Sequence, residues 1–234
     1  MLSIIIPTLN EEKYLPRLLA SIRAQNFLDY EIIVSDGGSL DKTKQIALDN
    51  NCLFITDTEH HHPAWQRNNG AAVAQGDILL FLDADSVLPE NFLAKSLKEF
   101  IALDLIGAAF YIRFNPSKTH YYIYSTLFNI FSRARQYFSP VGAGAAILAK
   151  KSGHEAIKGF DVGIYVAEDF DYCNRLATQG KFRMISSSRI LFSARRLEKE
   201  GELKLCFKWF SMGIFTLFNI KIKKKIVKYD FGKY

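Results

Sequence analysis

The sequence predicts an α/β fold, with a doubly wound, mostly parallel sheet covered by helices on both faces. Short apolar runs alternate four times with segments of helical periodicity within about the first hundred residues, as in successive strand and helix units. Runs such as residues 78–82 are unbroken, as expected for strands buried on both faces. The 234-residue chain is 49% hydrophobic and 23% charged, which argues against a disordered or fibrous protein.

The expected elements follow one another in a regular order. Residues 2–6 form an apolar run, and the next apolar positions have the spacing of a helix for which Asn10 is the expected cap. A second strand is expected at residues 31–34, before a helix that opens near Asp41. The third and fourth strands, at 53–55 and 78–82, precede helices at 64–74 and 89–102.

Beyond Phe114 the alternation stops. The chain then has an aromatic stretch at residues 121–131, small residues at 142–146, an acidic cluster at 168–171 and an expected strand at 184–192. No linker rich in Pro, Gly or Ser divides it. We therefore predict a single domain over residues 1–200, followed by an amphipathic helix and a basic tail at 201–234.

The positive charge is concentrated near the carboxyl end. Residues 195–234 contain eleven Lys and Arg but four Asp and Glu, whereas the whole chain has a net charge of +6. The part before residue 195 is therefore close to neutral. A nucleic-acid-binding protein would be expected to carry a basic stripe on its folded domain, so nucleic acid is not an expected partner.

The three cysteines lie far apart, at positions 52, 173 and 206, and lack metal-ligand spacing. Neither a disulfide framework nor a zinc site is expected. The first apolar run is shorter than the roughly 7 to 15 residues of a signal-peptide core. No uncharged run reaches the ~20 residues needed to cross a bilayer. We therefore expect a cytoplasmic protein.

Polar residues follow three of the expected strands, at positions 7–11, 35–39 and 83–86. Ligands of such sheets bind at the carboxyl ends of the strands, so we expect these clusters to converge on one edge. Asp83 and Asp85 stand two positions apart, and their carboxylates can leave on one face and share a magnesium or manganese ion. Such an ion can neutralise a departing diphosphate. The alternative is that the pair merely ends a strand and caps a turn.

Two further features near this edge suit a ligand. Asp36 precedes two glycines, which let backbone approach a ligand closely, and its carboxylate can accept from ribose hydroxyls or a base N–H. Arg67, early in the third expected helix, can pair with an acidic ligand or with Asp36. The alternatives are ordinary turn chemistry at Asp36 and a solvated arginine at position 67.

The acidic cluster at residues 168–171 begins an expected helix. Acids interact favourably with the positive end of a helix dipole, and that effect alone can account for them. The functional interpretation makes Asp169 a general base that removes the proton from an acceptor hydroxyl. This role requires a carboxylate in a cleft.

Basic residues after the last expected strand complete the candidate site. Arg195 and Arg196 can neutralise a diphosphate from the side opposite the metal, because the planar fork of arginine matches phosphate oxygens. The alternative is an exposed dibasic loop. Three consecutive histidines, at 60–62, are interpreted as a solvated loop, since adjacent side chains do not easily converge on one ion.

These motifs, in this order, resemble family 2 glycosyltransferases of the GT-A fold. The matching segments are residues 3–11, 34–43, 66–71, 76–85, 159–161 and 168–171, so the resemblance covers about residues 2–200. It implies a Rossmann-like, doubly wound mixed sheet. It also implies a nucleotide-sugar-binding half at residues 1–115 and an acceptor half at 116–200.

The resemblance implies an inverting, metal-dependent transfer of a sugar from a UDP- or GDP-linked donor. Within the site that it implies, Asp83 and Asp85 hold Mn²⁺ or Mg²⁺ and the diphosphate, and Asp169 is the base. The nucleoside is contacted by Pro7, Glu11 and Asp36, with Arg67 supporting that pocket. The full substrate-binding set is Pro7, Thr8, Glu11, Asp36, Arg67, Asp83, Ala84, Asp85, Glu168, Arg195 and Arg196.

The chain departs from the family pattern in two places. Ser35 stands where many members carry a first aspartate before Asp36, which leaves the recognition of the base open. The Gln-x-x-Arg-Trp motif of processive synthases is absent, and Ala194 with the two arginines occupies that neighbourhood. A single-addition enzyme is therefore favoured over a polymerase.

The basic tail has two interpretations. Residues 202–222 leave a narrow polar stripe on a helical wheel, and five lysines lie between positions 221 and 228. The segment is either an interfacial helix that brings the site to a lipid-linked acceptor at the inner face of the membrane, or a helix packed on the domain or a second subunit. Each basic residue near anionic lipid could contribute about 1 kcal/mol. The sequence does not specify the oligomeric state.

Two other functions share some of these features. A sugar-phosphate nucleotidyltransferase would also use a mixed α/β sheet and a metal, but typically has a glycine-rich phosphate loop after its first strand, and residues 7–10 contain no glycine. A non-catalytic nucleotide or membrane-surface binder would be indicated by loss of Asp83, Asp85 or Asp169. All three are present.

Overall fold

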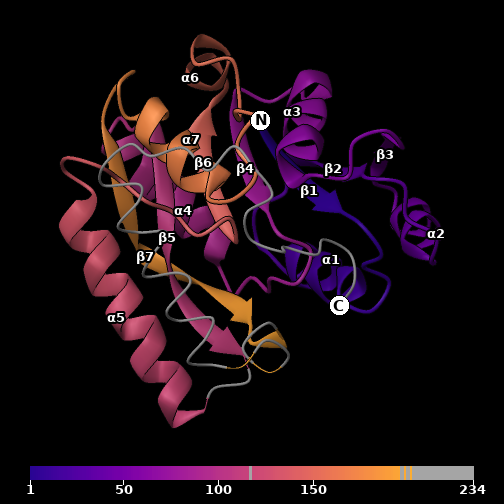
Figure 1. Ribbon diagram of the computed structural model, residues 1–234, viewed down its shortest axis with the longest axis horizontal. Coiled ribbons are helices and arrows are strands. Elements are labelled where there is room, and N and C mark those ends of the chain that lie inside the picture. Colours follow the sequence, from indigo (N-terminus) through magenta and orange to yellow (C-terminus); the bar gives the residue numbers. More distant parts are fainter. Residues whose placement is uncertain (116–117, 196–197, 199–200, 202–234) are drawn as a thin grey trace.

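A mixed sheet forms the centre of the computed structural model, which describes residues 1–115, 118–195, 198 and 201 (Figure 1). Within that part of the chain the sheet has seven strands in the order β3-β2-β1-β4-β6-β5-β7. The strands are β1 (Leu2–Thr8), β2 (Tyr30–Asp36), β3 (Leu53–Thr56), β4 (Ile78–Leu82), β5 (Gly107–Asn115), β6 (Ala146–Lys150) and β7 (Phe182–Ser193).

Strand β6 is antiparallel to both of its neighbours, β4 and β5. The other strands of the described sheet run in one direction, because β1 pairs in parallel with β2 and β4, β2 with β3, and β5 with β7. The predicted doubly wound and mostly parallel sheet is therefore confirmed.

Helices cover both faces of the sheet. They are α1 (Leu15–Arg23), α2 (Thr43–Asp49), α3 (Pro63–Val73), α4 (Phe92–Ala102), α5 (Thr119–Arg135), α6 (Lys151–Ala156) and α7 (Glu168–Leu176). One buried cluster joins the sheet to α1, α2, α4 and α5, and a second joins it to α3 and α7. Alternating side chains of β1 enter different clusters, with Ile4 and Ile6 in the first and Ile5 in the second. Both faces of β1 are therefore buried, which explains its unbroken apolar sequence.

The first helix begins later than the position of Asn10 suggested. Its N-cap residue is Tyr14, with Pro16 in the first turn, so the expectation that Asn10 caps this helix is wrong. Asn10 instead adopts a left-handed backbone conformation, with φ of 56°, and its Oδ1 accepts a hydrogen bond from the Leu40 N–H at 2.9 Å. The side chain thus joins the loops after β1 and β2.

The second half of the chain contains elements that its sequence pattern did not reveal. The aromatic stretch is part of α5, a 17-residue helix that packs along β5. The small residues at 142–146 lead into β6, and α7 begins at Glu168 as predicted. No helix among the described residues is both long and apolar enough to cross a membrane.

Candidate active site

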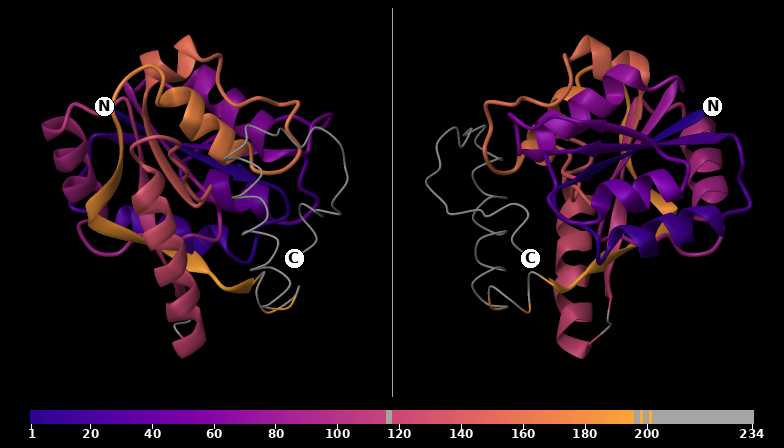
Figure 2. Two further views of the ribbon diagram at one scale, coloured as in Figure 1. Left: turned by 60° about the vertical axis from the view of Figure 1, so that its left-hand side comes forward. Right: turned by 90° about the vertical axis from the view of Figure 1, so that its right-hand side faces the viewer.

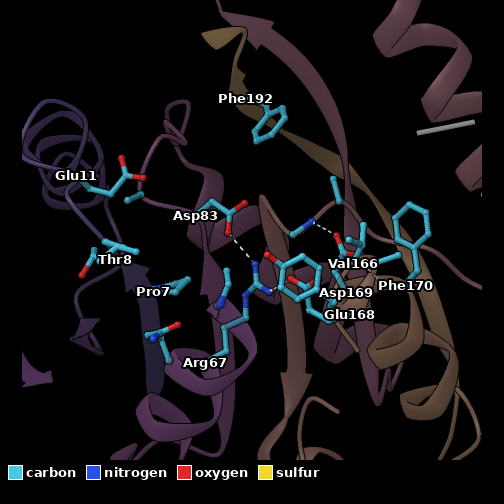
Figure 3. Close-up of a pocket in the computed structure, with 18 of the residues that line it drawn as sticks. Pro7, Thr8, Glu11, Arg67, Asp83, Val166, Glu168, Asp169, Phe170 and Phe192 are labelled. Carbon is cyan, nitrogen blue, oxygen red and sulfur yellow. Dashed lines mark hydrogen bonds and ion pairs between the residues drawn. The ribbon is translucent and has the colours of Figure 1, made fainter. Parts of the chain in front are cut away.

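A pocket opens at the carboxyl ends of β1 and β4 (Figure 3). Residues of the first half, including Pro7, Thr8 and Asp83, line one side, and residues that follow α5 in sequence, including Glu168 and Asp169, line the other. Two of the three predicted polar clusters thus line the pocket. The third adjoins it, because the Gly37 N–H donates a hydrogen bond to the Thr8 carbonyl at 2.8 Å.

Arg67 lies at the floor of this pocket and joins its two sides. Its Nη2 is 2.9 Å from Oδ1 of Asp83, and its Nη1 is 2.8 Å from Oε1 of Glu168. The side chain is only 3% exposed. Burial alone would lower the pKa of Arg67, but the two carboxylates raise it above its ordinary value. Arg67 is therefore a permanent cation between two acids, and its predicted pairing with Asp36 is not observed.

Asp169 faces the pocket from the first turn of α7. Its Oδ2 accepts a hydrogen bond from the Gly144 N–H at 2.7 Å, and its Oδ1 accepts one from the Phe170 N–H at 2.9 Å. Burial, together with the negative charge of Glu168, raises the pKa of Asp169 to about 7. A carboxylate with a pKa in this range is suited to general base chemistry near neutral pH.

The N-cap of α7 holds these acids in place. The N-cap residue, Ala167, adopts a left-handed conformation with φ of 65°, which is uncommon for a residue with a side chain. The chain therefore turns sharply before the helix starts. Glu168 and Asp169, the first two residues of α7, both line the pocket after this turn.

Gly144 is a close neighbour of three charged groups. A Cβ atom at this position would lie 2.8 Å from Nη2 of Arg67, 3.3 Å from Oδ2 of Asp169 and 3.5 Å from Oδ2 of Asp83. Asp83 and Asp169, which come from opposite sides of the pocket, thus approach the same glycine. The sequence indicated only a run of small residues here, and the lack of a side chain at position 144 is what allows the approach.

Asp85 does not share the surroundings of Asp83. Its side chain is 3% exposed, and its Oδ2 lies 2.8 Å from Nε of Arg195. Asp83 lines the main pocket, whereas Asp85 lines a separate small cavity near Tyr14. We expected both carboxylates to face one ion. In the structure Asp83 is instead ion-paired with Arg67, and Asp85 with Arg195.

Arg195 is held by two acids. Its guanidinium forms a two-pronged interaction with Glu11, at 2.8 and 2.9 Å, in addition to its ion pair with Asp85. Burial raises the pKa of Glu11, although Arg195 acts in the opposite direction. This cluster ties the end of β7 to the loops after β1 and β4. Arg195 lines the pocket, but its guanidinium is held by these two acids, whereas we expected it to neutralise a diphosphate.

Asp36 shapes a loop and is not among the residues that line the pocket. It is 2% exposed, and its oxygens accept hydrogen bonds from the hydroxyls of Thr8 and Ser39 and from the N–H groups of Gly38 and Ser39. The structure thus favours the turn interpretation of Asp36 over an open carboxylate for a nucleoside.

The three histidines, which the sequence analysis interpreted as a solvated loop, each contact a different partner. His60 stacks on Trp65 and pairs with Asp57, His61 contacts the Gly37 carbonyl, and His62 contacts the Tyr165 carbonyl. His61 also lines the pocket, a position that the sequence did not indicate.

The described residues contain no group of three or more His, Cys, Asp or Glu side chains arranged to hold a metal. Asp83 nevertheless offers a part-exposed carboxylate in the pocket, with Oδ1 on Arg67 and Oδ2 near Gly144. Mg²⁺ is commonly bound through one or two protein carboxylates together with substrate phosphates. The single carboxylate of Asp83 therefore fits a divalent ion whose other ligands come from a diphosphate.

An apolar wall was not predicted. Ile112 of β5, Phe128 of α5 and Phe192 of β7 line the pocket on the side of the later elements. They are far apart in sequence, so no local pattern could have grouped them. Arg196 and the tail at 202–234, by contrast, lie outside the residues that the structure describes.

The fold is that of solved GT-A glycosyltransferases. A mannosyltransferase of Pyrobaculum calidifontis, solved with GDP-Man and Mn²⁺, matches with a TM-score of 0.71 and 19% identity over 90% of this chain and 64% of its own. S. aureus TarS 1-349 with UDP-GlcNAc matches with a TM-score of 0.65 and 17% identity, over 92% of this chain and 66% of its own.

Curated relatives match a shorter part of the chain. A GalNAc(5)-diNAcBac-PP-undecaprenol beta-1,3-glucosyltransferase of Campylobacter jejuni is 35% identical over 104 residues, which is 42% of this chain and 34% of its own length. A PGL/p-HBAD biosynthesis glycosyltransferase of Mycobacterium tuberculosis is 42% identical over 97 residues, 38% of this chain and 37% of its own. The chain thus spans well under half of these relatives.

A family model supplies the most extensive sequence match. The model described as glycosyl transferase family 2 matches residues 3–155, well over half of the chain. The matched region includes β1 to β4, the pocket acids that follow β1 and β4, Arg67 and Gly144. The chain therefore belongs to glycosyl transferase family 2.

Proposed function

We propose that this glycosyltransferase transfers a sugar, with inversion at the anomeric carbon, from a nucleoside diphosphate sugar to a hydroxyl or phosphate of a lipid-linked or envelope-glycan acceptor. The observation that carries the proposal is the approach of Asp83 and Asp169 to Gly144 from opposite sides of one pocket. This arrangement suits a reaction that needs a diphosphate site and a base facing each other across the anomeric carbon.

In the proposed reaction, the carboxylate of Asp169 takes the proton of the acceptor hydroxyl. The acceptor oxygen then bonds to the anomeric carbon while the bond from that carbon to the diphosphate oxygen breaks. The N–H groups of Gly144 and Phe170 orient the carboxylate for this step. Arg67 fixes the positions of Asp83 and Glu168 relative to each other, so that the donor and acceptor sides of the pocket stay aligned.

Asp83 is the residue that we propose to hold Mn²⁺ or Mg²⁺ together with the donor diphosphate. Bound there, the ion would supply positive charge for the diphosphate as it leaves. In this proposal Asp85 acts through Arg195, whose pairing with Glu11 and Asp85 fixes the loops that border the donor. The Mn²⁺ in the mannosyltransferase complex supports the choice of a divalent ion.

We place the nucleotide sugar in the half formed by residues 1–115, where Pro7, Thr8 and Ala84 border the pocket. The solved relatives bind GDP-Man in one case and UDP-GlcNAc in another, so both bases remain candidates. The acceptor is placed in the half formed by residues 116–200. The Campylobacter relative's name specifies an undecaprenol-linked substrate, which supports a lipid-linked acceptor and a peripheral position on the inner face of the membrane.

A thermal-shift screen with UDP- and GDP-sugars, each with and without Mn²⁺, tests this function. A donor should raise the melting temperature more when Mn²⁺ is present, because a ligand that binds only the folded state stabilises it. The selected donor should then be consumed with release of its nucleoside diphosphate when acceptor is added. Failure of every nucleotide sugar to bind or react would refute the proposal.

A further inference from the structure

The outer face of α5 exposes apolar side chains that the proposed reaction does not use. The helix buries Tyr121 and Ser125 on its inner side and stands on the outside of the molecule (Figure 2). Exposed large apolar side chains lie on the other side, and we call them the α5 outer stripe: Tyr122, Ile123, Leu127 and Ile130, with Tyr137 and Phe138 just beyond the helix. The spacing of its helical members places them on one helix face.

The charges of α5 itself are positive. Residues 119–135 contain no Asp or Glu, and the exposed Arg133 lies in the last turn of α5. Arg183 of β7 lies over the ring of Tyr137, 4.6 Å from its centroid, and Arg189 of the same strand is exposed. Apolar and aromatic side chains beside arginines are the composition of a surface that lies on anionic lipid headgroups.

The same helix contributes to the pocket. Phe128, next in sequence to the exposed Leu127, lines the pocket with Ile112 and Phe192. Contact of the outer stripe with a bilayer would therefore bring this apolar wall, and Asp169 across the pocket, close to the lipid. An acceptor attached to a hydrocarbon chain could then reach the base without leaving the membrane surface completely.

We propose that the α5 outer stripe docks the protein on an anionic lipid surface, from which a lipid-linked acceptor enters the pocket along the apolar wall. This inference rests on the proposed acceptor class. A lipid surface fits better than a second copy of the chain, because a symmetric contact through this face would bring like-charged arginines together. The apolar side chains would enter the headgroup region while Arg133, Arg183 and Arg189 meet lipid phosphates.

Vesicle flotation of the full chain tests the stripe. Vesicles of phosphatidylcholine with phosphatidylglycerol should float the wild-type protein, and pure phosphatidylcholine should float less of it. The double variant Leu127→Glu/Ile130→Glu should partition about tenfold less into the anionic vesicles, because it removes two apolar anchors and adds two repelling charges. Wild-type flotation by this variant would overturn the proposal.

The matched control is Ile101→Glu/Leu28→Glu. Ile101 is 65% exposed and Leu28 is 81% exposed, so both are at least as exposed as Leu127 at 60% and Ile130 at 61%. Neither control residue lies on α5. This control should float like the wild type, and an equal loss in the control would overturn the assignment to α5. If the glutamates unfold the stripe variant, as judged by its melting temperature, Leu127→Ser/Ile130→Ser replaces it with the same expectation.

Two further readouts separate the possible outcomes. Light scattering that shows a dimer in the wild type and a monomer in the stripe variant, with flotation unchanged, would assign the stripe to a second copy and overturn the proposal. Flotation needs neither donor nor acceptor. Stripe-dependent flotation without sugar transfer would therefore refute only the proposed function, whereas transfer without stripe-dependent flotation would refute only the lipid surface.

Discussion

Nη2 of Arg67 lies 2.9 Å from Oδ1 of Asp83, so a helix on one face of the sheet is ion-paired with the first acid after β4. The other end of the same guanidinium binds Glu168 at the start of α7. One buried cation therefore sets the distance between the two sides of the pocket. This relationship leads to predictions about stability as well as catalysis.

Arg67→Met should destabilise the protein strongly. Loss of the guanidinium leaves Asp83 and Glu168 without a partner, and breaking a buried ion pair by removing one member costs about 3–5 kcal/mol. Urea unfolding measures the change in the free energy of unfolding. Arg113→Met, at an exposed position on β5, is the matched control and should change it by less than about 0.5 kcal/mol. A loss at Arg67 as small as in the control would contradict the assigned role.

Asp169→Asn should reduce sugar transfer by about 10²- to 10⁴-fold while leaving donor binding intact, because it removes a general base but keeps the size of the side chain. The rate of nucleoside diphosphate release in the presence of acceptor measures transfer, and calorimetry with the donor measures binding. Asp29→Asn, at an exposed position, should retain the wild-type rate. Equal turnover in the Asp169 variant would exclude this residue as the base.

The pKa of Asp169, raised to about 7 by burial, predicts two opposite pH effects. Transfer should fall as the pH drops below about 7, because the base becomes protonated. The free energy of unfolding should instead fall as the pH rises from about 4 to 7, since the folded protein then holds a proton that the unfolded chain has released. Transfer rates and urea unfolding between pH 4 and 8 measure both. The Asn variant should lack this contribution to the pH dependence of stability, and an unchanged profile in it would assign the effect to another group.

Gly144→Ala should impair transfer more than folding. The added Cβ would lie 2.8 Å from Nη2 of Arg67, so the guanidinium or the loop that contains residue 144 must move. The guanidinium pairs with the acids beside the base, and the loop donates a hydrogen bond to the base itself, Asp169. Forcing a methyl group into a packed site typically costs 1–3 kcal/mol. Steady-state kinetics and thermal unfolding measure the two effects. Gly163→Ala, whose Cβ would meet only the Asp161 carboxylate, should leave the rate unchanged, and an unaffected Gly144→Ala enzyme would show that this approach is not required.

Removal of divalent ions should stop transfer. We expect EDTA to abolish nucleoside diphosphate release and added Mn²⁺ or Mg²⁺ to restore it, because the leaving diphosphate loses its counter-charge without the ion. Asp83→Asn should raise the Mn²⁺ concentration needed for half-maximal rate. Asp77→Asn, before β4, serves as the control and should leave that concentration unchanged. Full activity in EDTA would show that the enzyme does not need a divalent ion.

The carboxyl ends of the strands were predictable, whereas the partners of the side chains there were not. The apolar runs at 2–6 and 78–82 indicated where β1 and β4 end, and therefore where Pro7 and Asp83 would lie. The ion pair between Asp85 and Arg195 could not be anticipated, because it depends on where β7 ends relative to β4. The antiparallel strand β6 was also missed, since its short sequence follows a run of small residues with no helical or alternating pattern.

By itself, the sequence determined the alternation of strands and helices, the acids at the strand ends and the family of the chain, because hydrophobic periodicity and short motifs are local properties. Only the tertiary structure decided which charges meet. Arg67 and Glu168 are 101 residues apart, and Glu11 and Arg195 are 184 apart. Such pairs form where the strand order brings distant loops to one edge of the sheet, and the energy of a buried ion pair depends on that geometry rather than on spacing along the chain.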